Sequence, residues 1–408
     1  MASRFAPSFR ARLSTVVIVA MCCASLVTGC AMTGEVREAV PRDLVDRVIV
    51  PGYNRIRFWG DDPHSMTDID VLLIHDQKAA AAEKDPSIDL NSSNALTISG
   101  GASNGAFGAG ILAGWTQTGN RPRFDTVTGI STGALIAPFV FLGPEYDDEL
   151  TEAFTTINTT DVLEMKSVVA TFTGDSFVSS EPLRHLVEKY ITDEMLDNIA
   201  REHGNGRRLL IGTTNIDADR PVIWDMGAIA TSGMPDRKKL FQDILIASAA
   251  IPGVFPPARL SVTADGHRYE ELHVDGGTSH QVFLMPAGFS LRDADRRINH
   301  EGVKRRLFII RNGRTTPEYS VVKASMISIA GKSISSLTKN QGVGDLYRLY
   351  AVAQRDDIDY NYVDIPVDFQ MKETVPFDPI YMRGLYRRGY DMAILDVPWE
   401  KVPPGFAD

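Results

Sequence analysis

The chain has 408 residues, of which 44% are hydrophobic and 23% are charged. This is the composition of an ordinary globular protein with enough apolar material for a large core. Its formal net charge of -10 argues against nucleic acid as a partner, because binding phosphates requires clustered lysine and arginine.

The N-terminal segment has the parts of a secretory signal peptide. Its start carries three arginines, and no acidic residue occurs among the first 34 positions. An apolar stretch follows from about Leu13 to Val27. This stretch is shorter than the roughly 20 apolar residues of a membrane-spanning helix, which favours a cleaved signal peptide over residues 1–29.

The end of that segment, Leu26-Val27-Thr28-Gly29-Cys30, resembles the lipobox of bacterial lipoproteins. The resemblance implies cleavage before Cys30, a diacylglycerol thioether on its thiol, and an acyl chain such as palmitate on its new amine. Several acyl chains would attach the protein durably to a membrane. Because Ala31 rather than aspartate follows, we expect a lipid-anchored protein of the bacterial cell envelope, sorted to the outer membrane. An uncleaved anchor or an ordinary secretion signal is the alternative.

The three cysteines all lie within the first 30 residues, so the mature chain has no disulfide and no cysteine nucleophile. Residues 30–94 are polar and irregular apart from a helix-like patch at 77–84, and we interpret them as a tether and N-terminal extension.

Beyond residue 94, short apolar runs alternate with helical patterns. The expected strands are 95–99, 124–128, 208–214, 221–225 and 306–310, and the expected helices are 107–115, 134–142 and 238–250.

Alternating strands and helices predict a mainly parallel sheet covered on both faces, in one domain over residues 95–408. A C-terminal helical cap is expected from about Pro317. The histidines show no metal-binding spacing, so we expect no metal and no cofactor. No pattern specifies the oligomeric state.

The first segment with catalytic chemistry is Gly129-Ile130-Ser131-Thr132-Gly133, a Gly-x-Ser-x-Gly sequence between an expected strand and an expected helix. A nucleophile elbow requires this context, because glycines on both sides let the backbone turn sharply and expose the serine Oγ. The helix N-terminus behind Ser131 favours negative charge that develops there. Ser131 is therefore the candidate nucleophile, with Gly129 and Gly133 as the elbow glycines.

A glycine-rich segment, Ser99-Gly100-Gly101-Ala102-Ser103-Asn104-Gly105, lies about 30 residues upstream, again between a strand and a helix. Such a loop allows backbone N–H groups to converge on an oxyanion. A tight turn or a phosphate-binding loop is the alternative. The dinucleotide fingerprint does not fit because Ala102 occupies its second glycine position, and no Gly-Lys-Ser/Thr follows for a Walker-type loop.

A third segment, Val274-Asp275-Gly276-Gly277, places an aspartate at a strand end before two glycines. A carboxylate in this position can act as the general base that removes the proton of a serine hydroxyl. The alternative is an ordinary turn, for which Asp-Gly-Gly is also typical.

Together, these three segments in this order resemble the patatin-like phospholipases. Two further stretches, 213–226 and 247–257, are also similar to that family. In all, the resemblance covers about residues 95–312. It implies a three-layer α/β/α fold related to cytosolic phospholipase A2 and a Ser131–Asp275 dyad without histidine. The backbone amides of Gly100, Gly101 and Ala102 would form the oxyanion hole, with Gly276 and Gly277 in the acid loop. The expected activity is hydrolysis of carboxyl esters in membrane lipids or other acyl esters, with the 249–257 loop lining the acyl channel.

Two positions depart from the family pattern, which has a third glycine where Ala102 stands and a basic residue where Asn104 stands. We expect an alanine to retain the backbone donor only if its φ is negative. Loss of the basic residue makes a phospholipid substrate less certain than acyl hydrolysis itself.

Three alternatives remain open. His280 or His300 could complete a conventional triad, since each follows Asp275 in the chain. The protein could be a degenerate scaffold that binds envelope lipids or partners. An alcohol could also replace water as the acyl acceptor.

Overall fold

The computed structural model describes residues 37–165 and 176–406, without the side chain of Ile327. The predicted signal peptide and Cys30 lie outside the described residues. The strands are β1 (Arg57–Trp59), β2 (Ser92–Ile98), β3 (Thr126–Ile130), β4 (Glu164–Met165), β5 (Val178–Ser179), β6 (Arg208–Asn215), β7 (Arg220–Asp225), β8 (Ala258–Ala264), β9 (His267–Asp275), β10 (Lys304–Arg311) and β11 (Ile358–Asp364). The α-helices are α2 (Asp68–Ala82), α3 (Gly105–Gln117), α4 (Thr132–Leu142), α5 (Asp147–Thr155), α6 (Thr159–Val162), α8 (Glu181–Tyr190), α9 (Asp193–Gly204), α10 (Met226–Ala230), α11 (Arg237–Ser248), α12 (Leu291–Arg297), α13 (Met326–Asp356) and α14 (Pro379–Leu395). Short 3-10 helices are η1 (Arg42–Arg47), η2 (Ala102–Asn104), η3 (Pro144–Tyr146) and η4 (Gly276–Thr278).

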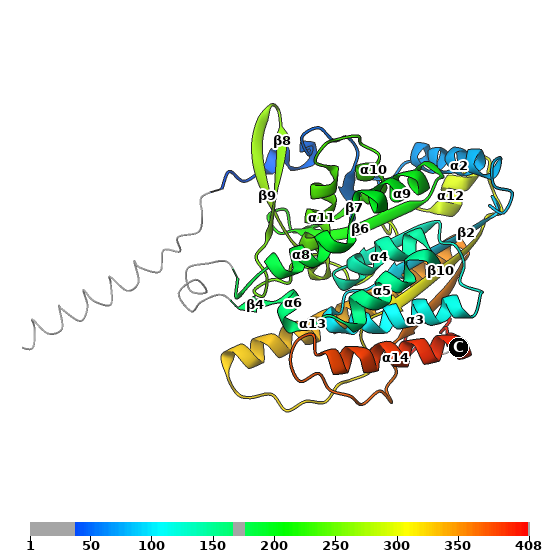
Figure 1. The fold of residues 1–408 in the computed structure, drawn as a ribbon. Helices are drawn as coiled ribbons and strands as arrows, with labels where there is room; N and C mark the ends of the chain where they lie inside the picture. The colour runs from blue at the N-terminus through cyan, green and yellow to red at the C-terminus, as the bar shows by residue number, and fades with distance from the viewer. Residues whose placement is uncertain (1–36, 166–175, 407–408) are drawn as a thin grey trace, which may run out of the picture.

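A central sheet with strand order β1-β7-β6-β3-β2-β10-β11 organises the fold (Figure 1). Strands β6, β3, β2, β10 and β11 run parallel, whereas β7 and β1 continue the sheet in antiparallel pairing. The parallel strands are buried over most of their length, as expected for strands covered on both faces. This arrangement confirms the mainly parallel sheet that the sequence predicts.

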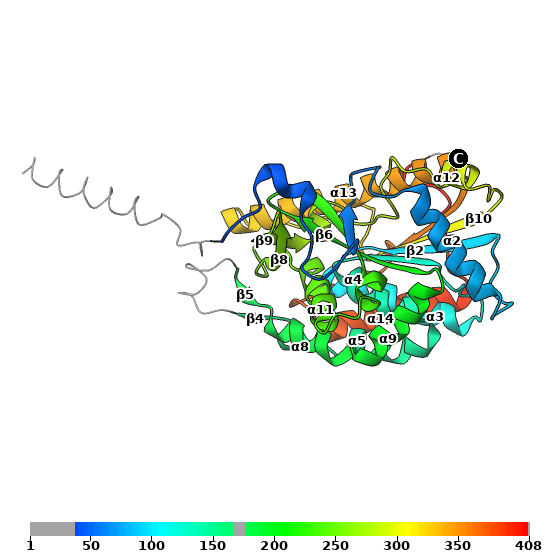
Figure 2. The same ribbon diagram turned by 90° about the horizontal axis from the view of Figure 1, so that it is seen from above.

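Helices cover both faces of the sheet, which confirms the three-layer α/β/α architecture. Figure 2 shows α3, α5, α9, α11 and α14 along one face and α12 and α13 along the other. The larger core cluster fills the first interface, and a second cluster packs Leu346, Leu349 and Ala353 of α13 onto the sheet. Among residues 37–165 and 176–406, no helix is long and apolar enough to cross a bilayer.

The C-terminal segment differs from the expected helical cap. Strand β11 pairs in parallel with β10 at the edge of the sheet, and α14 packs along α3. The periodicity of residues 326–395 indicates helices, but it does not show that this segment also supplies an edge strand.

One edge of β6 is shared by two strands that approach each other from opposite directions. Along residues 208–212, β6 pairs in parallel with β3, and Ile130 lies opposite Gly212. From the next residue onward, β6 pairs instead with the antiparallel strand β9, and Asp275 lies opposite Thr213. The C-terminal ends of β3 and β9 therefore meet on this edge of β6.

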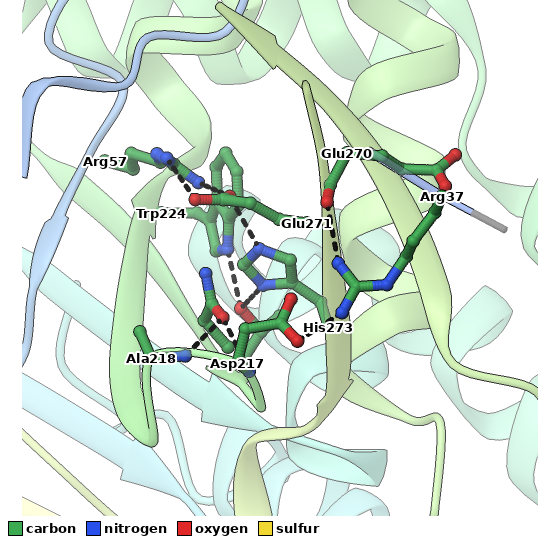
Figure 3. A network of polar contacts seen from close by, with 10 residues as sticks. Arg37, Arg57, Asp217, Ala218, Trp224, Glu270, Glu271 and His273 are labelled. Carbon is green, nitrogen blue, oxygen red and sulfur yellow. Dashed lines mark hydrogen bonds and ion pairs between the residues drawn. The ribbon is translucent and has the colours of Figure 1, made fainter. Parts of the chain in front are cut away.

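A buried polar network holds β9 against its neighbours (Figure 3). Glu271 of β9 accepts two hydrogen bonds from Arg57 of β1, and it lies 3.1 Å from Nε2 of His273. The other ring nitrogen, Nδ1, lies 2.9 Å from Oγ1 of Thr213, which accepts a 2.8 Å hydrogen bond from the indole of Trp224. The network thus joins β1, β7, β6 and β9 inside the protein.

The network has one consistent direction of hydrogen bonding. The Trp224 indole can only donate, so the Thr213 oxygen accepts from it and the Thr213 hydroxyl hydrogen remains available for Nδ1 of His273. The proton of the neutral His273 ring is then on Nε2, which donates to Glu271. Burial lowers the pKa of His273, which favours this neutral ring. Burial alone would raise the pKa of Glu271, but the hydrogen bond with His273 and the charge of Arg57 outweigh it and lower that pKa to about 2.

Replacing Arg57 by methionine should destabilise the protein strongly. Arg57→Met leaves the buried Glu271 carboxylate without its cationic partner, so we expect the free energy of unfolding to fall by roughly 3–5 kcal/mol. Chemical denaturation at pH 7 measures this. Arg47→Met is the matched control, because Arg47 forms an exposed ion pair with Asp265 and should cost less than about 1 kcal/mol. Equal stability of the two variants would contradict this account of the network.

Candidate active site

Ser131 lies at the sharp turn between β3 and α4. Its backbone has φ 55° and ψ -124°, in the left-handed half of φ space that a nucleophile elbow imposes on its serine. Close packing of backbones requires a glycine two residues later, since a Cβ on Gly133 would lie 2.2 Å from the carbonyl oxygen of Ile98. Gly129 lies in β3 directly before this turn. Ser131 is buried at the carboxyl end of the parallel strands.

Asp275 ends β9 and lies beside Ser131. The backbone N–H of Gly277 donates a 2.7 Å hydrogen bond to its Oδ1, which fixes the carboxyl group at the start of the η4 turn formed by Gly276, Gly277 and Thr278. Burial raises the pKa of Asp275, and hydrogen bonds from the hydroxyl of Ser131 and the N–H of Gly277 offset part of this rise, so that the pKa is about 6. A carboxyl group with such a pKa is ionised at neutral pH and basic enough to accept a proton from serine.

The C-terminal end of α11 holds both residues in place. The Oγ of the fully buried Ser248 accepts a 3.0 Å hydrogen bond from the backbone N–H of Ser131 and donates a 2.7 Å hydrogen bond to the carbonyl of Gly212. Two residues later, the carbonyl of Ala250 accepts a 2.8 Å hydrogen bond from the N–H of Asp275. The sequence of this stretch gives no sign that Ser248 positions Ser131.

The glycine-rich loop lies directly against Ser131. A Cβ on Gly100 would be 2.9 Å from the Cβ of Ser131. Within the described parts of the chain, the backbone N–H groups of Gly100, Gly101 and Ala102 donate to no protein acceptor. Unpaired donors beside a serine are the requirement for an oxyanion hole.

Ala102 adopts φ +49°, not the negative φ that we expected its backbone donor to require, and its N–H has no backbone acceptor among the described residues. The left-handed conformation costs alanine roughly 1–2 kcal/mol, which the surrounding structure can impose on a single residue. The loop is therefore strained at Ala102.

Two asparagines tie this loop to neighbouring elements. Asn312 follows β10 and donates hydrogen bonds to the hydroxyl and the carbonyl of Ser99, at 2.8 and 2.9 Å, and its Oδ1 accepts from the N–H of Gly108. The side chain of Asn104 accepts a 2.7 Å hydrogen bond from the hydroxyl of Tyr381 in α14. Sequence reasoning missed Asn312, because its role depends on a contact more than 200 residues away along the chain.

An apolar cavity of about 760 Å³, counting its open mouth, leads to Ser131. Helices α4, α5 and α8 supply about half of the residues that line it. The tyrosine and threonine hydroxyls are its main polar groups besides the serine. Three residues of the 249–257 segment line it, as the sequence suggests for an acyl channel; these are Ala249, Ile251 and Phe255. The cavity suits a long hydrocarbon chain whose end reaches Ser131.

Neither histidine of the alternative triad lies at this site. His300 contacts the ring of His75 and lines a cavity with Ser92 and Asp125, at the amino-terminal ends of the strands. His280 lines a different cavity with Arg348 of α13. The buried His273 is already bonded at both ring nitrogens. Residues 37–165 and 176–406 contain no group of three or more metal-binding side chains that could hold an ion.

The strain at Ala102 predicts a stabilising substitution. Ala102→Gly should raise the free energy of unfolding by about 0.5–1 kcal/mol, because glycine adopts this φ without strain. Chemical denaturation measures the change. The same substitution at Ala106 inside α3 is the control and should lower stability by about 1 kcal/mol. A destabilised Ala102→Gly variant would show that this backbone is not strained.

A match to one protein family agrees with the motifs. The family described as patatin-like phospholipase matches residues 96–287. Among solved structures, the chain is similar to VipD from Legionella pneumophila with 12% identity and a TM-score of 0.38, over 75% of this chain and 66% of VipD. A comparison with curated proteins gives no match. Residues 96–287, just under half of the chain, are thus similar to patatin-like phospholipases.

Proposed function

We propose that the protein is a serine lipid acyl hydrolase with Ser131 as nucleophile and Asp275 as general base. The observation that carries the proposal is a strained elbow serine beside a buried carboxyl group of pKa about 6, at the end of an apolar cavity. Patatin-like phospholipases as a family hydrolyse lipid acyl esters, and the family match supports the same reaction class here.

In the first step, the ionised Asp275 takes the hydroxyl proton as Ser131 Oγ attacks the ester carbonyl carbon. The carbonyl oxygen becomes an oxyanion, which the N–H groups of Gly100, Gly101 and Ala102 stabilise; one such donor contributes roughly 3 kcal/mol. The positive end of α4 favours the same charge. When the tetrahedral intermediate collapses, the C–O bond to the alcohol breaks, and Asp275 returns its proton to the leaving oxygen.

In the second step, water replaces the alcohol. Asp275 removes a proton from water as its oxygen attacks the acyl-enzyme carbonyl, and the same donors hold the second oxyanion. Collapse releases the fatty acid and returns the proton to Ser131. The cavity wall supports a substrate with a long acyl chain, because its lining is almost wholly apolar.

The location of the enzyme is also part of the proposal. The lipobox-like sequence at residues 26–30 supports cleavage before Cys30 and lipid attachment to it, in the bacterial envelope and at the outer membrane. Such an anchor would keep the active site close to a bilayer that contains its substrate.

The direct test is ester hydrolysis by residues 31–408, which contain the whole described fold. We expect release of p-nitrophenol from butyrate and octanoate esters, and a loss of at least roughly 10³-fold in kcat for Ser131→Ala and for Asp275→Asn. Because Asp275 must be ionised, kcat/KM should fall about tenfold per pH unit below about pH 6.

Folding of every variant is checked by circular dichroism. A well-folded wild type that turns over neither these esters nor mixed phospholipid vesicles would overturn the proposal and favour a binding scaffold. An activity that persists in Asp275→Asn would instead remove only the dyad.

The raised pKa of Asp275 also predicts a cost in stability at high pH. The native carboxyl binds protons more tightly than the unfolded one, with a pKa near 6 instead of 3.8, so its ionisation opposes folding above pH 6 and not below pH 4. Asp275→Asn should therefore be more stable than wild type at pH 8, by up to about 3 kcal/mol, with no advantage at pH 4. Denaturation curves at both pH values measure this. Ser131→Ala keeps the carboxyl but loses the hydroxyl that lowers its pKa, so its pH dependence should be at least as large as that of wild type. If Asp275→Asn also keeps the pH dependence, another group is responsible.

A further inference from the structure

The first half of α13 carries an apolar stripe that no described part of the protein covers. Met326, Ile329, Ile334 and Leu337 recur at helical spacing along one side, and all are exposed, Met326 by 85% and Leu337 by 71%. Among the described side chains of residues 326–341, none is buried. A surface helix normally turns such a stripe toward the core, so an exposed stripe marks an interaction surface.

The same helix changes character along its length. From Asp345 onward it packs on the sheet, with Leu346, Leu349 and Ala353 buried in the second core cluster. The stripe therefore belongs to the free half of one continuous helix, and the packed half fixes its direction. Tyr319 and Val321, in the loop before the helix, are also exposed and extend the apolar surface.

The charge of this segment is opposite to that of the whole chain. Residues 319–344 contain three lysines (Lys323, Lys332 and Lys339) and no acidic residue, although the protein has a net charge of -10. On a helical projection, Lys332 and Lys339 lie on the side away from the stripe. Apolar residues on one side and lysines on the other are typical of helices that lie in the surface of an anionic membrane.

Two other features lie at the same end of the molecule. Both views place the start of α13, the β4–β5 pair and the beginning of the described chain at this end (Figures 1 and 2). Met165 of β4 and Phe177 beside β5 are exposed there. Val162, three residues before Met165, lines the cavity that leads to Ser131. One end of the protein thus combines exposed apolar side chains with the wall of the acyl cavity.

We infer that the free half of α13, residues 326–341, is a membrane-binding face that inserts its apolar stripe into a bilayer containing anionic lipids. This face extends the proposed function but does not depend on it, because it needs neither Ser131 nor Asp275. Cys30 is seven residues before Arg37, and an extended chain of seven residues is about 25 Å long. A membrane held at a lipidated Cys30 would therefore lie within reach of this end.

The lysines favour a membrane over a second copy of the chain. In a symmetric dimer the stripe would face its own copy, and each copy would bring three lysines and no acidic residue of residues 319–344 to the region of contact. An anionic bilayer supplies the missing counter-charge and an apolar interior together.

The test measures binding of residues 31–408 to vesicles, in the Ser131→Ala background so that no lipid is consumed. The described core clusters lie within residues 44–397, so this chain contains them all. Co-sedimentation is measured with vesicles of phosphatidylethanolamine and phosphatidylglycerol, and with phosphatidylcholine alone. We expect Ile329→Ser/Leu337→Ser to weaken binding at least tenfold. Ile69→Ser/Leu395→Ser is the matched control and should leave binding within twofold. It removes an isoleucine from α2 and a leucine from the far end of α14 that are even more exposed than Ile329 and Leu337.

A second pair of variants tests the charge. Lys323→Glu/Lys332→Glu should abolish the preference for phosphatidylglycerol, whereas Lys84→Glu/Lys304→Glu at other surface sites should retain it. The inference is overturned if the stripe variant binds vesicles as tightly as its control. It is also overturned if light scattering shows a dimer that the stripe variant converts to monomer while vesicle binding stays absent, because the stripe then covers a second copy. Since hydrolysis plays no part in these assays, an inactive enzyme would leave the vesicle result unchanged.

Discussion

The active site depends on one constraint, the meeting of β3 and β9 on a shared edge of β6. Consecutive residues of β6, Gly212 and Thr213, lie opposite Ile130 and Asp275, so the strand ends that carry the proposed nucleophile and base point at each other. Ser248 joins this junction from α11 by binding both the N–H of Ser131 and the carbonyl of Gly212. A shift of β9 by one residue would turn the Asp275 side chain to the opposite face of the sheet, because side chains alternate along a strand.

The surroundings of the junction explain why that register is held so firmly. The site contains several unfavourable features, since Ser131 and Ala102 have positive φ and Asp275 is a buried carboxyl group. Such features persist only where the surrounding structure leaves no alternative. The network of Arg57, Glu271 and His273 supplies that rigidity, because it connects β9 to β1 and, through Thr213, to β6 and β7. A fully satisfied polar network specifies one arrangement of strands more sharply than apolar packing does.

The sequence predicts the local parts of this arrangement and not the long-range ones. The strand–turn–helix units around Gly100 and Ser131 follow from apolar runs bounded by glycines, and they lie where expected, as β2–α3 and β3–α4. The antiparallel entry of β9 cannot be predicted this way, because its pairing with β6 depends on residues about 60 positions apart. The role of Asn312 is invisible for the same reason. For the stripe of α13, the sequence suggests a contact that the structure lacks. The spacing of its apolar residues is that of a buried face, and only the structure reveals that these residues are exposed.

Helix α13 connects this exposed stripe physically to the acid loop. Asp345, where the helix begins to pack on the sheet, accepts hydrogen bonds from the N–H groups of Gln281 and Val282. The side chain of Gln281 in turn donates to the carbonyl of Gly277, whose own N–H holds Asp275. A helix is stiff over this length, so the orientation of its free half and the position of the loop after Asp275 are set by the same rigid element. The surface that we assign to the bilayer and the carboxyl group that we assign to catalysis are thus linked by one helix and four hydrogen bonds, not merely by lying in one domain.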